Sequence, residues 1–453
     1  MPAIAGFKAY DLRGRVPSEL NDDVAYRIGR AYAEYLRPDR VVVGRDIRLS
    51  SPAIGEALAR GLADSGVDVH DIGICGTEMI YFATSDADMD GGIMVTASHN
   101  PVDYNGMKFV RRDSRPISGD TGLMEIQRIA EADAYSTPAR QGGRYDLDIA
   151  DRYIDHLCSY LDVERLRPLR IVVNAGNGGA GLVIDRLEKR LPFEFIKLHH
   201  EPDGNFPNGV PNPMLEETRQ PTIEAIRRHK AHLGIAWDGD FDRCFFFDET
   251  GAFVEGYYIV GLLASMFLEQ EPGARIVHDP RLTWATTEIV ESLGGKPVLS
   301  KSGHAFIKDV MREADAVYGG EMSAHHYFRR FAYCDSGQIP WLLVAQLMGR
   351  SGKPLSALVG ERIAMFPASG EINRKVDDTA ATIDRLRKLY EPGALEVDFT
   401  DGLSVEFANW RFNLRGSNTE PLIRLNVESR GDEALMHDKT AELLERIGGT
   451  ASH

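Results

Sequence analysis

The sequence predicts an α/β protein with three similar α/β units that face a shared cleft, followed by a separate α+β domain. Runs of β-branched residues alternate with segments of helical periodicity, which favours parallel sheets with crossover helices. One strand–helix–strand pattern occurs three times, and after Ser369 the chain changes to short strands and hairpin-like turns. The length of 453 residues fits three or four domains at roughly 150 residues each.

Each of the three units contains three predicted strands. The first strand is expected at residues 40–46, 170–177 and 275–281, the second at 68–74, 193–199 and 296–302, and the third at 91–98, 232–240 and 316–322. A helix follows the first strand, and in the first unit Ser51 is placed to cap it, with Pro52 at its first position. Ligands of open α/β sheets bind beyond the carboxyl ends of the strands, where the third strands carry Ser98, Asp238 and Glu321. We therefore expect these side chains to face one cleft.

The C-terminal part is predicted from short strands and two helices. Strands are expected within residues 370–376, 401–416 and 421–429, and helices at 378–390 and 432–449. Polar seams lie at residues 136–146, 248–251 and 366–370. They predict four domains with bounds 1–145, 146–249, 250–367 and 368–453.

The composition excludes several classes of partner. Lys and Arg number 52 and Asp and Glu 68, so the formal charge of −16 argues against nucleic acid and anionic membrane, while a small anion is allowed where positive charge is gathered locally. The cysteines lie far apart without a C-x-x-C pair, which indicates neither a zinc site nor a disulfide framework. The N-terminus has no signal-peptide core, and no run reaches the roughly 18 apolar residues of a membrane span. We expect a cytoplasmic monomer or small homo-oligomer.

Three aspartates alternate along the stretch DGDFDR, residues 238–243. Asp238, Asp240 and Asp242 can converge on one hard cation, Mg²⁺ or Ca²⁺, because a tight loop turns alternate carboxylates inward. An EF-hand fails, because Arg243 stands where the turn needs glycine and the flanks LGIAW and CFFF are predicted strands. A solvated acidic turn is the plainer alternative, but the adjoining Arg243 favours a bound phosphate.

A glycine-rich stretch offers a competing interpretation. Residues 176–181 spell G-x-G-x-x-G after a predicted strand, and Glu201 follows at about the distance of the ribose-binding acid in a dinucleotide site. A dehydrogenase is therefore an alternative. Glycines here would equally let a helix pack closely on its strand.

Two further loops carry groups suited to a sugar phosphate. Residues 415–421, RGSNTEP, offer a guanidinium, hydroxyls, an amide and backbone N–H groups for phosphate oxygens, with Arg424 close behind; an ordinary polar hairpin is the alternative. Glu321 and Ser323 suit vicinal sugar hydroxyls, and His325 is either a proton-transfer group or a buried structural histidine. Basic residues near strand ends or in loops would form a phosphate-accepting patch only if they lie together: Lys8, Arg13, Arg45, Arg48, Lys108, Arg281, Lys301 and His304.

Ser98 ends a predicted strand in the stretch VTASHNP, where the Asn-Pro turn keeps its hydroxyl projecting. It lacks the G-x-S-x-G elbow, which disfavours an acyl-transfer triad. A hydroxyl near a three-carboxylate cation site instead indicates phosphoryl transfer, in which the metal offsets charge on the transferring group.

Four motifs in this order resemble those of the α-D-phosphohexomutases, in particular the bacterial phosphomannomutase/phosphoglucomutase branch. They are TASHNP from Thr96, DGDFDR from Asp238, GEMS from Gly320 and RGSNT from Arg415, and the likeness extends from YDLRG at Tyr10 to the C-terminal domain. The resemblance implies three α/β domains with mixed sheets and a TATA-binding-protein-like C-terminal domain around a deep central cleft. It implies interconversion of hexose 6-phosphate and hexose 1-phosphate through a phosphoserine enzyme and a hexose 1,6-bisphosphate. Mg²⁺ would be the cofactor, mannose or glucose phosphates the substrates, and GDP-mannose or polysaccharide precursor supply the pathway.

The resemblance also implies roles for individual residues. The metal set is Ser98, through a phosphate oxygen, with Asp238, Asp240 and Asp242. The catalytic set is Ser98, His99, Lys108, Arg243 and His325. The substrate-binding set is Tyr10, Arg13, Arg281, His304, Glu321, Ser323, Arg415, Ser417, Asn418, Thr419 and Arg424. Ser98 would carry the phosphate and Arg243 would orient it, while Lys108 and His325 would transfer protons.

Three positions differ from the commoner family pattern. Phe241 and Ala324 replace usual glycines, and Arg281 stands where lysine is common. None of these changes removes a ligand, but they bear on the shape of the metal and sugar loops. A dehydrogenase and a non-catalytic sugar-phosphate-binding protein remain the alternatives. Mannose and glucose phosphates differ only at C2, and no motif here reads that carbon.

Overall fold

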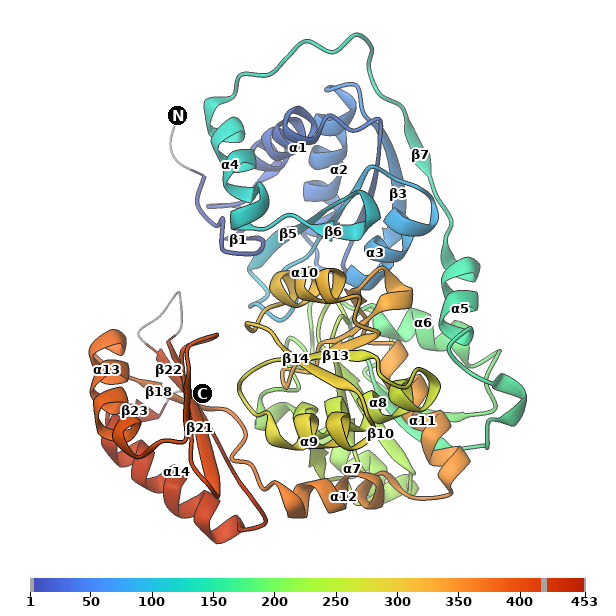
Figure 1. Cartoon of the computed structure of the whole chain (residues 1–453). Helices are drawn as coiled ribbons and strands as arrows, with labels where there is room; N and C mark the ends of the chain where they lie inside the picture. Colours follow the sequence, from blue (N-terminus) through green and yellow to red (C-terminus); the bar gives the residue numbers. More distant parts are fainter. Residues whose placement is uncertain (1–3, 417–421, 452–453) are drawn as a thin grey trace. The chain divides into compact units, whose positions relative to one another are not determined.

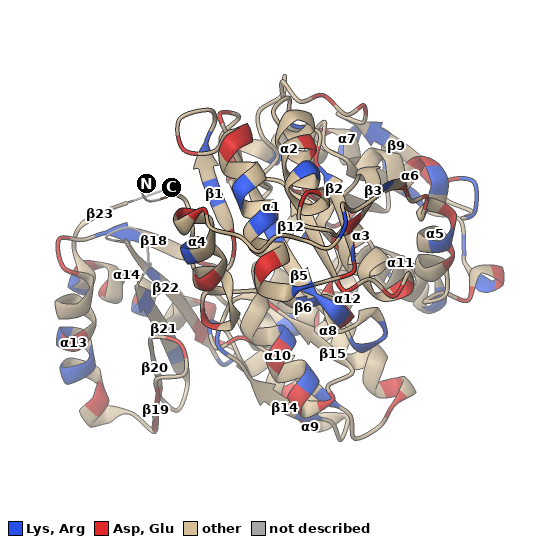
Figure 2. Ribbon diagram, turned by 90° about the horizontal axis from the view of Figure 1, so that it is seen from above, with Lys and Arg blue, Asp and Glu red and all other residues tan. Residues whose placement is uncertain are grey.

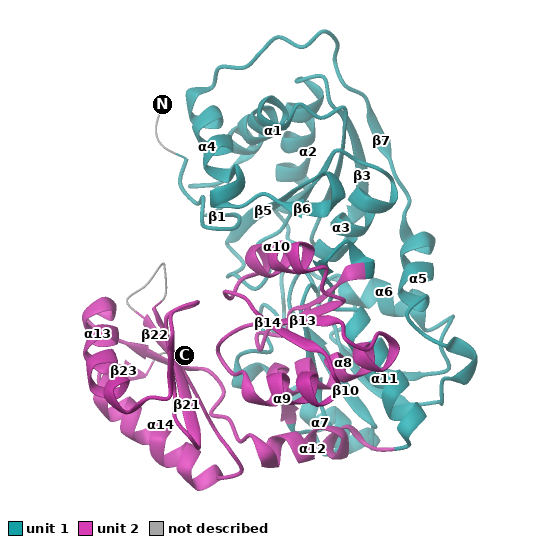
Figure 3. Ribbon diagram, in the orientation of Figure 1, with its two compact units in different colours: residues 1–252, 330–352 teal, residues 253–329, 353–453 magenta. Residues whose placement is uncertain are grey.

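The computed structural model describes residues 4–416 and 422–451 (Figure 1). The chain divides into two compact units (Figure 3). Unit 1 comprises Met1–Ala252 and Arg330–Gly352, and unit 2 comprises Phe253–Arg329 and Lys353–His453.

Unit 1 begins with a mixed sheet in the order β1-β5-β4-β2-β3-β7, with β6 paired to β5. Its strands are β1 (Leu12–Arg15), β2 (Arg40–Arg45), β3 (Asp68–Ile74), β4 (Gly91–Val95), β5 (Tyr104–Arg111), β6 (Arg115–Pro116) and β7 (Arg144–Asp146). Its helices are α1 (Asp22–Leu36), α2 (Ser51–Ala63), α3 (Thr77–Asp86) and α4 (Leu123–Ala132). Every residue of β4 is buried, as expected for a central strand covered on both faces. This strand leads directly to Ser98.

The second sheet of unit 1 has the order β11-β10-β8-β9. Its strands are β8 (Arg170–Asn174), β9 (Glu194–Leu198), β10 (Leu233–Trp237) and β11 (Cys244–Phe247). The helices of this part are α5 (Ala150–Cys158), α6 (Ala180–Leu187) and α7 (Gln220–His229). The chain returns to unit 1 through β17 (Cys334–Asp335) and α11 (Ile339–Ser351). The loop between β10 and β11 carries the three aspartates.

Unit 2 begins with a sheet in the order β14-β13-β15-β16. Its strands are β13 (Arg275–His278), β14 (Lys296–Leu299), β15 (Tyr318–Gly320) and β16 (His326–Phe328), preceded by β12 (Phe253–Val254). The helices are α8 (Gly256–Gln270), α9 (Trp284–Ser292), α10 (His304–Ala314) and α12 (Leu355–Met365). The loop after β15 carries Glu321 and Ser323.

The C-terminal part of unit 2 is an antiparallel sheet in the order β19-β20-β21-β22-β18-β23. Its strands are β18 (Ile372–Lys375), β19 (Glu396–Asp398), β20 (Leu403–Glu406), β21 (Trp410–Gly416), β22 (Leu422–Ser429) and β23 (Thr450–Ala451). Helices α13 (Thr379–Tyr390) and α14 (Glu433–Ile447) lie on one face of this sheet (Figure 1). Asp378 and Asp432 cap them, each accepting a backbone N–H of the first turn. The predicted α+β domain is confirmed.

The predicted threefold repeat is also confirmed. The three sheets share the segments β3-β2-β4-β5, β9-β8-β10-β11 and β14-β13-β15-β16, so each follows the same order of strands. The first three strands of each segment are parallel, and the fourth is antiparallel to its neighbour. This fourth strand makes the sheets mixed.

The predicted cap of α2 is wrong by one residue. The structure places Ser50 at the N-cap without a side-chain capping bond, and Ser51 is already the first helical residue. The Ser51 hydroxyl instead donates to Asp46 at 2.5 Å. The Ser51 hydroxyl is therefore bonded to the buried Asp46 carboxylate and is not used to cap the start of α2.

The helix surfaces carry charges of both signs (Figure 2). On α13, Asp384 pairs with Arg387 at 2.9 Å and with Lys388 at 2.7 Å. Opposite charges three or four residues apart on a helix face each other and stabilise the helix slightly. Among the helices of residues 4–416 and 422–451, none is long and apolar enough to cross a membrane.

Candidate active site

Ser98 lies in a tightly held loop after β4. Its backbone is left-handed, with φ at +48°, a conformation that costs a non-glycine residue roughly 1 kcal/mol or more. Arg48 pins this loop, because its guanidinium donates to four backbone carbonyls. They belong to Ser98 at 2.9 Å, Asn100 at 2.6 Å, Pro101 at 2.7 Å and Tyr104 at 2.9 Å. Arg48 is only 1% exposed, so it supports the loop and does not belong to a phosphate-accepting patch.

The aspartate loop packs directly on the serine loop. One oxygen from each of Asp238, Asp240 and Asp242 lies within 4.8 Å of the others, and all three residues are buried. A Cβ on Gly239 would lie 2.4 Å from the carbonyl oxygen of Ser98, so only glycine permits this approach. The two loops, 140 residues apart in sequence, thus meet in unit 1.

Phe241, one of the departures from the family pattern, is accommodated by small neighbours. Its backbone φ is +45° and its side chain is fully buried. A Cβ on Gly76 would lie 2.3 Å from the Phe241 ring, and one on Gly179 would lie 3.0 Å from it. The ring therefore fills space that glycines leave free beneath the aspartate loop.

The Ser98 hydroxyl makes direct contact with the aspartate loop. Its Oγ donates to Asp238 Oδ2 at 2.9 Å, and Arg243 Nε donates to the same oxygen at 2.9 Å. Arg243 Nη2 also donates to His99 Nδ1 at 2.5 Å. Desolvation and the Arg243 guanidinium hold the pKa of His99 well below its usual range. A neutral His99 accepts a hydrogen bond from Arg243, while Asp238 accepts a hydrogen bond from the Ser98 hydroxyl.

Lys108, on β5, neutralises the other two aspartates. Its Nζ lies 2.7 Å from Asp240 Oδ2 and 2.5 Å from Asp242 Oδ2, and the Thr77 hydroxyl donates to Asp240 Oδ2 at 2.5 Å. Burial acts to lower the pKa of Lys108, but Asp240 and Asp242 outweigh it and raise that pKa. Burial acts to raise the pKa of Asp240, but Lys108 and Arg13 outweigh it and hold that pKa low. Near neutral pH, Lys108 is therefore protonated and Asp240 is ionised.

The aspartate cluster fits a hard divalent cation. It presents only oxygen donors, which suit such an ion. Asp240 Oδ1 is buried and accepts no hydrogen bond from the described residues, although buried carboxylate oxygens usually have a partner. Asp238, Asp240 and Asp242 are the residues that would hold the ion.

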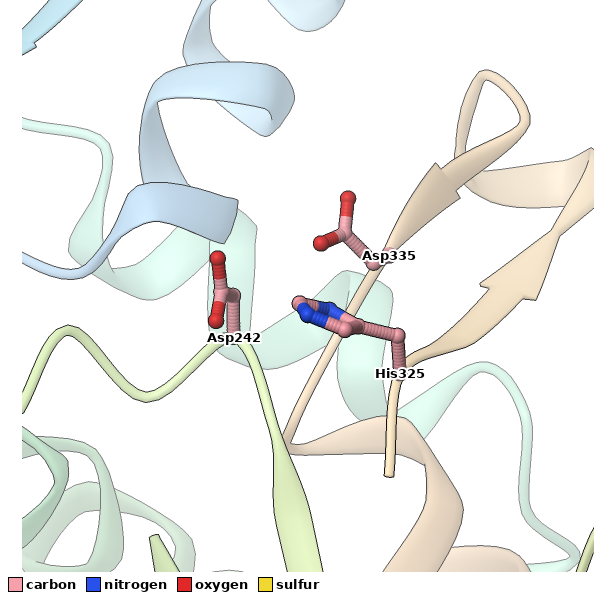
Figure 4. A group of neighbouring side chains, drawn as sticks. All are labelled: Asp242, His325 and Asp335. Atoms are coloured by element: carbon pink, nitrogen blue, oxygen red, sulfur yellow. The ribbon is translucent and has the colours of Figure 1, made fainter. Parts of the chain in front are cut away.

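A further buried carboxylate lies beside this cluster. Asp335, on β17, and Asp242 each offer an oxygen within 4.8 Å of the other (Figure 4). They are 1% and 2% exposed. Sequence reasoning missed Asp335, because a lone aspartate in the stretch CDSG matches no ligand spacing. His325, also labelled in Figure 4, belongs to unit 2.

Glu78 holds the turn at Gly337 and Gln338, which packs against the aspartate loop. It is fully buried on α3, and its carboxylate accepts from the Tyr153 hydroxyl and from the backbone N–H groups of Gly337 and Gln338. A Cβ on Gly337 would lie 2.3 Å from the carbonyl oxygen of Phe241, so this turn presses on the aspartate loop. No sequence motif marked Glu78, because its partners are distant in the chain.

Glu78 predicts a pH-dependent stability. Burial raises its pKa to about 8, against about 4.3 in an unfolded chain. A raised carboxyl pKa means that its contribution to stability is complete below about pH 4.3 and is lost as pH rises to about 8. Glu78→Gln should therefore unfold at a higher temperature than the wild type at pH 8.5, and the difference should shrink at pH 5.

Thermal unfolding followed by circular dichroism at both pH values measures this. The exposed Glu164→Gln is the matched control and should show no such dependence. A Glu78→Gln variant that stays equally far from the wild type at both pH values would contradict the assignment.

Unit 2 brings part of the predicted substrate set together. Arg281 is 3% exposed and donates to both Asp279 oxygens, at 2.9 and 2.8 Å. Its Nη2 also lies 3.3 Å from Glu321 Oε1 and 3.2 Å from Ser323 Oγ. Ala324, which follows, has φ at +70°, a region that glycine adopts more easily. Sequence reasoning missed Asp279, which lies two residues before Arg281.

The predicted site residues divide between the two units. Unit 1 holds Tyr10, Arg13, Ser98, His99, Lys108, Asp238, Asp240, Asp242 and Arg243. Unit 2 holds Arg281, His304, Glu321, Ser323, His325, Arg415 and Arg424. Ser417, Asn418 and Thr419 lie outside the described residues. In unit 1, Arg13 donates to Asp11 at 2.8 Å and to Asn100 in the serine loop at 3.1 Å.

The glycine-rich stretch serves close packing. A Cβ on Gly176 would lie 2.3 Å from Pro211, and one on Gly181 would lie 2.3 Å from the carbonyl oxygen of His200. These glycines are therefore explained by close packing of the chain against Pro211 and His200. The dinucleotide alternative is not supported.

Four family models match the chain in succession. Residues 5–136, 151–251 and 255–366 match the phosphoglucomutase/phosphomannomutase alpha/beta/alpha domains I, II and III, and residues 371–446 match the C-terminal domain of that family. A phosphomannomutase from Escherichia coli is 60% identical over 452 residues, 98% of this chain and 99% of that protein. A protein described as phosphohexose mutases from Xanthomonas campestris pv. campestris (strain B100) is 58% identical over 446 residues, 98% of this chain and 100% of that protein.

Solved structures give the same picture. A phosphoglucomutase/phosphomannomutase family protein from Burkholderia thailandensis is similar over 100% of both chains, with a TM-score of 0.89 and 36% identity. The open form of a Paramecium phosphoglucomutase covers 99% of this chain and 95% of its own, with a TM-score of 0.79. At 16% identity, the second likeness is one of fold alone.

Proposed function

Because the chain belongs to the phosphoglucomutase/phosphomannomutase family and is a hexose phosphate mutase, we propose that it works through a phosphoserine at Ser98 and a hexose 1,6-bisphosphate. The substrates proposed are mannose phosphate, glucose phosphate or both. The observation that carries this is the 2.9 Å contact between Ser98 Oγ and Asp238 in the carboxylate cluster. It supports a phosphoryl group on Ser98 reaching a cation in that cluster.

We assign Mg²⁺ to Asp238, Asp240 and Asp242, with one oxygen of the Ser98 phosphate. When bound, a divalent ion offsets the negative charge of the transferring phosphoryl group. Arg243 adds a second positive group beside Ser98, and its contact with Asp238 fixes its direction. The remaining steps use side chains of the protein.

The first transfer breaks the bond between Ser98 Oγ and phosphorus and forms a bond from phosphorus to the free sugar hydroxyl. That hydroxyl loses its proton to a base. Lys108 already holds a proton beside Asp240 and Asp242, so near neutral pH it is suited to donate that proton to the departing Ser98 Oγ rather than to accept one. We assign the base to His325, since a neutral imidazole nitrogen can accept a proton.

The bisphosphate then turns around, and its other phosphate returns to Ser98. Glu321 and Ser323 are proposed to hold sugar hydroxyls in both orientations. Arg281, Arg415 and Arg424, with the predicted Ser417, Asn418 and Thr419, are proposed to hold the phosphate that is not reacting. We further propose a cytoplasmic monomer or small homo-oligomer. The net charge of −16 disfavours nucleic acid and anionic membranes as partners.

Arg415→Ala tests the distal phosphate site. Charge-assisted hydrogen bonds to phosphate contribute about 1.5–3 kcal/mol, so KM for hexose phosphate should rise roughly 10- to 100-fold while kcat changes less. Steady-state kinetics measures both constants. The exposed Arg385→Ala is the control for lost charge. An unchanged KM in Arg415→Ala would remove Arg415 from the phosphate site.

A direct comparison of substrates tests the proposed activity. With Mg²⁺ and a trace of hexose 1,6-bisphosphate, we expect conversion of mannose 1-phosphate to the 6-phosphate, and the same assay with glucose 1-phosphate measures the preference. Conversion of neither sugar phosphate would overturn the proposal.

A further inference from the structure

We propose that Glu371 competes with the substrate phosphate for the arginines of unit 2 and thereby promotes release of that phosphate between the two transfers. This inference rests on the proposed function, because it takes Arg415 as a phosphate-binding residue. Glu371 lies directly before β18 and carried no signal in the sequence.

Glu371 is the carboxylate that three predicted phosphate-binding arginines share. Its Oε2 lies 2.8 Å from Arg415 Nη2 and 3.7 Å from Arg281 Nη1, and its Oε1 lies 3.7 Å from Arg424 Nη1. The three arginines come from the loop after β13, from β21 and from β22, and the Glu371 side chain is 11% exposed. Glu371 therefore stands where one anion meets all three guanidinium groups.

The arginines have no surplus positive charge. Arg415 also pairs with Asp401 at 3.2 Å, and Arg281 also pairs with Asp279 and Glu321. Burial acts to raise the pKa of Glu371, but Arg281, Arg415 and Arg424 outweigh it and lower that pKa, so Glu371 is ionised near neutral pH. A phosphate dianion entering this cluster has to replace one of the carboxylates to avoid repulsion.

Glu371 is the carboxylate that can be replaced most easily. Asp279 also accepts the backbone N–H of Met322 at 2.9 Å, and Glu321 accepts the Tyr327 hydroxyl at 2.6 Å. Asp401 accepts the backbone N–H of Ser302 at 3.2 Å. Within the described residues, by contrast, the Glu371 carboxylate is held by arginines alone.

Two of these guanidinium groups also have an N–H donor with no acceptor among the described residues. Arg415 Nε and Arg424 Nε are buried and donate to none of the described residues. A phosphate group has three terminal acceptor oxygens where a carboxylate has two, so it can use such donors. Exchange of Glu371 for phosphate thus keeps the arginines paired in both states, which lowers the barrier for the bisphosphate to leave and turn.

Glu371→Gln tests this role, because the amide keeps size and an acceptor oxygen but loses the charge. Titration calorimetry with inorganic phosphate should show a Kd about tenfold lower than in the wild type. KM for hexose phosphate should fall by a similar factor, and kcat should fall because the distal phosphate leaves more slowly. The exposed Glu361→Gln on α12 is the matched control and should leave all three constants unchanged.

An equal or weaker phosphate affinity in Glu371→Gln would overturn the inference, because it would mean that Glu371 only orients Arg415. Glu371→Asp keeps the charge and should stay near the wild-type Kd, and it serves if the glutamine variant does not fold. The binding arm involves no chemistry at Ser98. A failure of the phosphoserine mechanism would therefore appear in the Ser98 variant and not here.

Discussion

Ser98→Ala should lower mutase turnover at least about 10³-fold, because the residue that carries the phosphoryl group is lost. The hydroxyl contacts Asp238 at 2.9 Å, and its loop is held by Arg48 through backbone carbonyls that the substitution leaves in place. The arginines of unit 2 are unchanged, so affinity for inorganic phosphate should stay close to that of the wild type. The expected pattern is lost turnover with retained binding.

A coupled assay for hexose 6-phosphate, together with phosphate calorimetry, separates these two effects. Ser85→Ala removes an exposed hydroxyl from α3 and should keep full turnover. Retained turnover in Ser98→Ala would refute the covalent role.

Asp240→Asn should have the second large effect. The substitution takes one negative charge from the cluster and leaves Lys108 with Asp242 as its remaining carboxylate partner there. A site that stabilises transition-state charge loses roughly 10²–10³ in kcat when one such group is removed. The Mg²⁺ concentration for half-maximal activity should also rise at least about tenfold, because a ligand oxygen has lost its charge.

Turnover measured across a Mg²⁺ series tests this expectation. Asp162→Asn, an exposed residue of unit 1, controls for the change in net charge. If Asp240→Asn keeps the Mg²⁺ dependence of the wild type, the aspartate cluster is not the metal site.

The features that sequence could predict were those written in local patterns. The runs RVVVGR, RIVVN and RIVH each became the first strand of a repeat, because continuous β-branched residues suit a strand buried on both faces. The alternating aspartates of residues 238–242 likewise converge as their spacing predicts. Ser98 projects from the end of β4 to Asp238, as the strand and the following turn indicate.

The features that sequence could not predict depend on contacts between distant segments. Glu78 acquires its role from backbone N–H groups more than 250 residues away, and nothing near it in the chain marks that partnership. From sequence, Arg48 was one candidate for a phosphate-accepting patch. In the structure its guanidinium instead donates to four backbone carbonyls of the serine loop. No sequence motif marks Glu371. Its role depends on three arginines from other elements, which only the fold brings beside it.

The central claim is that Ser98 is the residue that carries the phosphoryl group. Incubation with hexose 1,6-bisphosphate, followed by digestion and tandem mass spectrometry, locates the phosphate directly. We predict one phosphoryl group on the peptide that contains Ser98, with fragment ions that place it on that side chain. An active enzyme with its phosphate on another residue, or with none on any residue, would contradict the account.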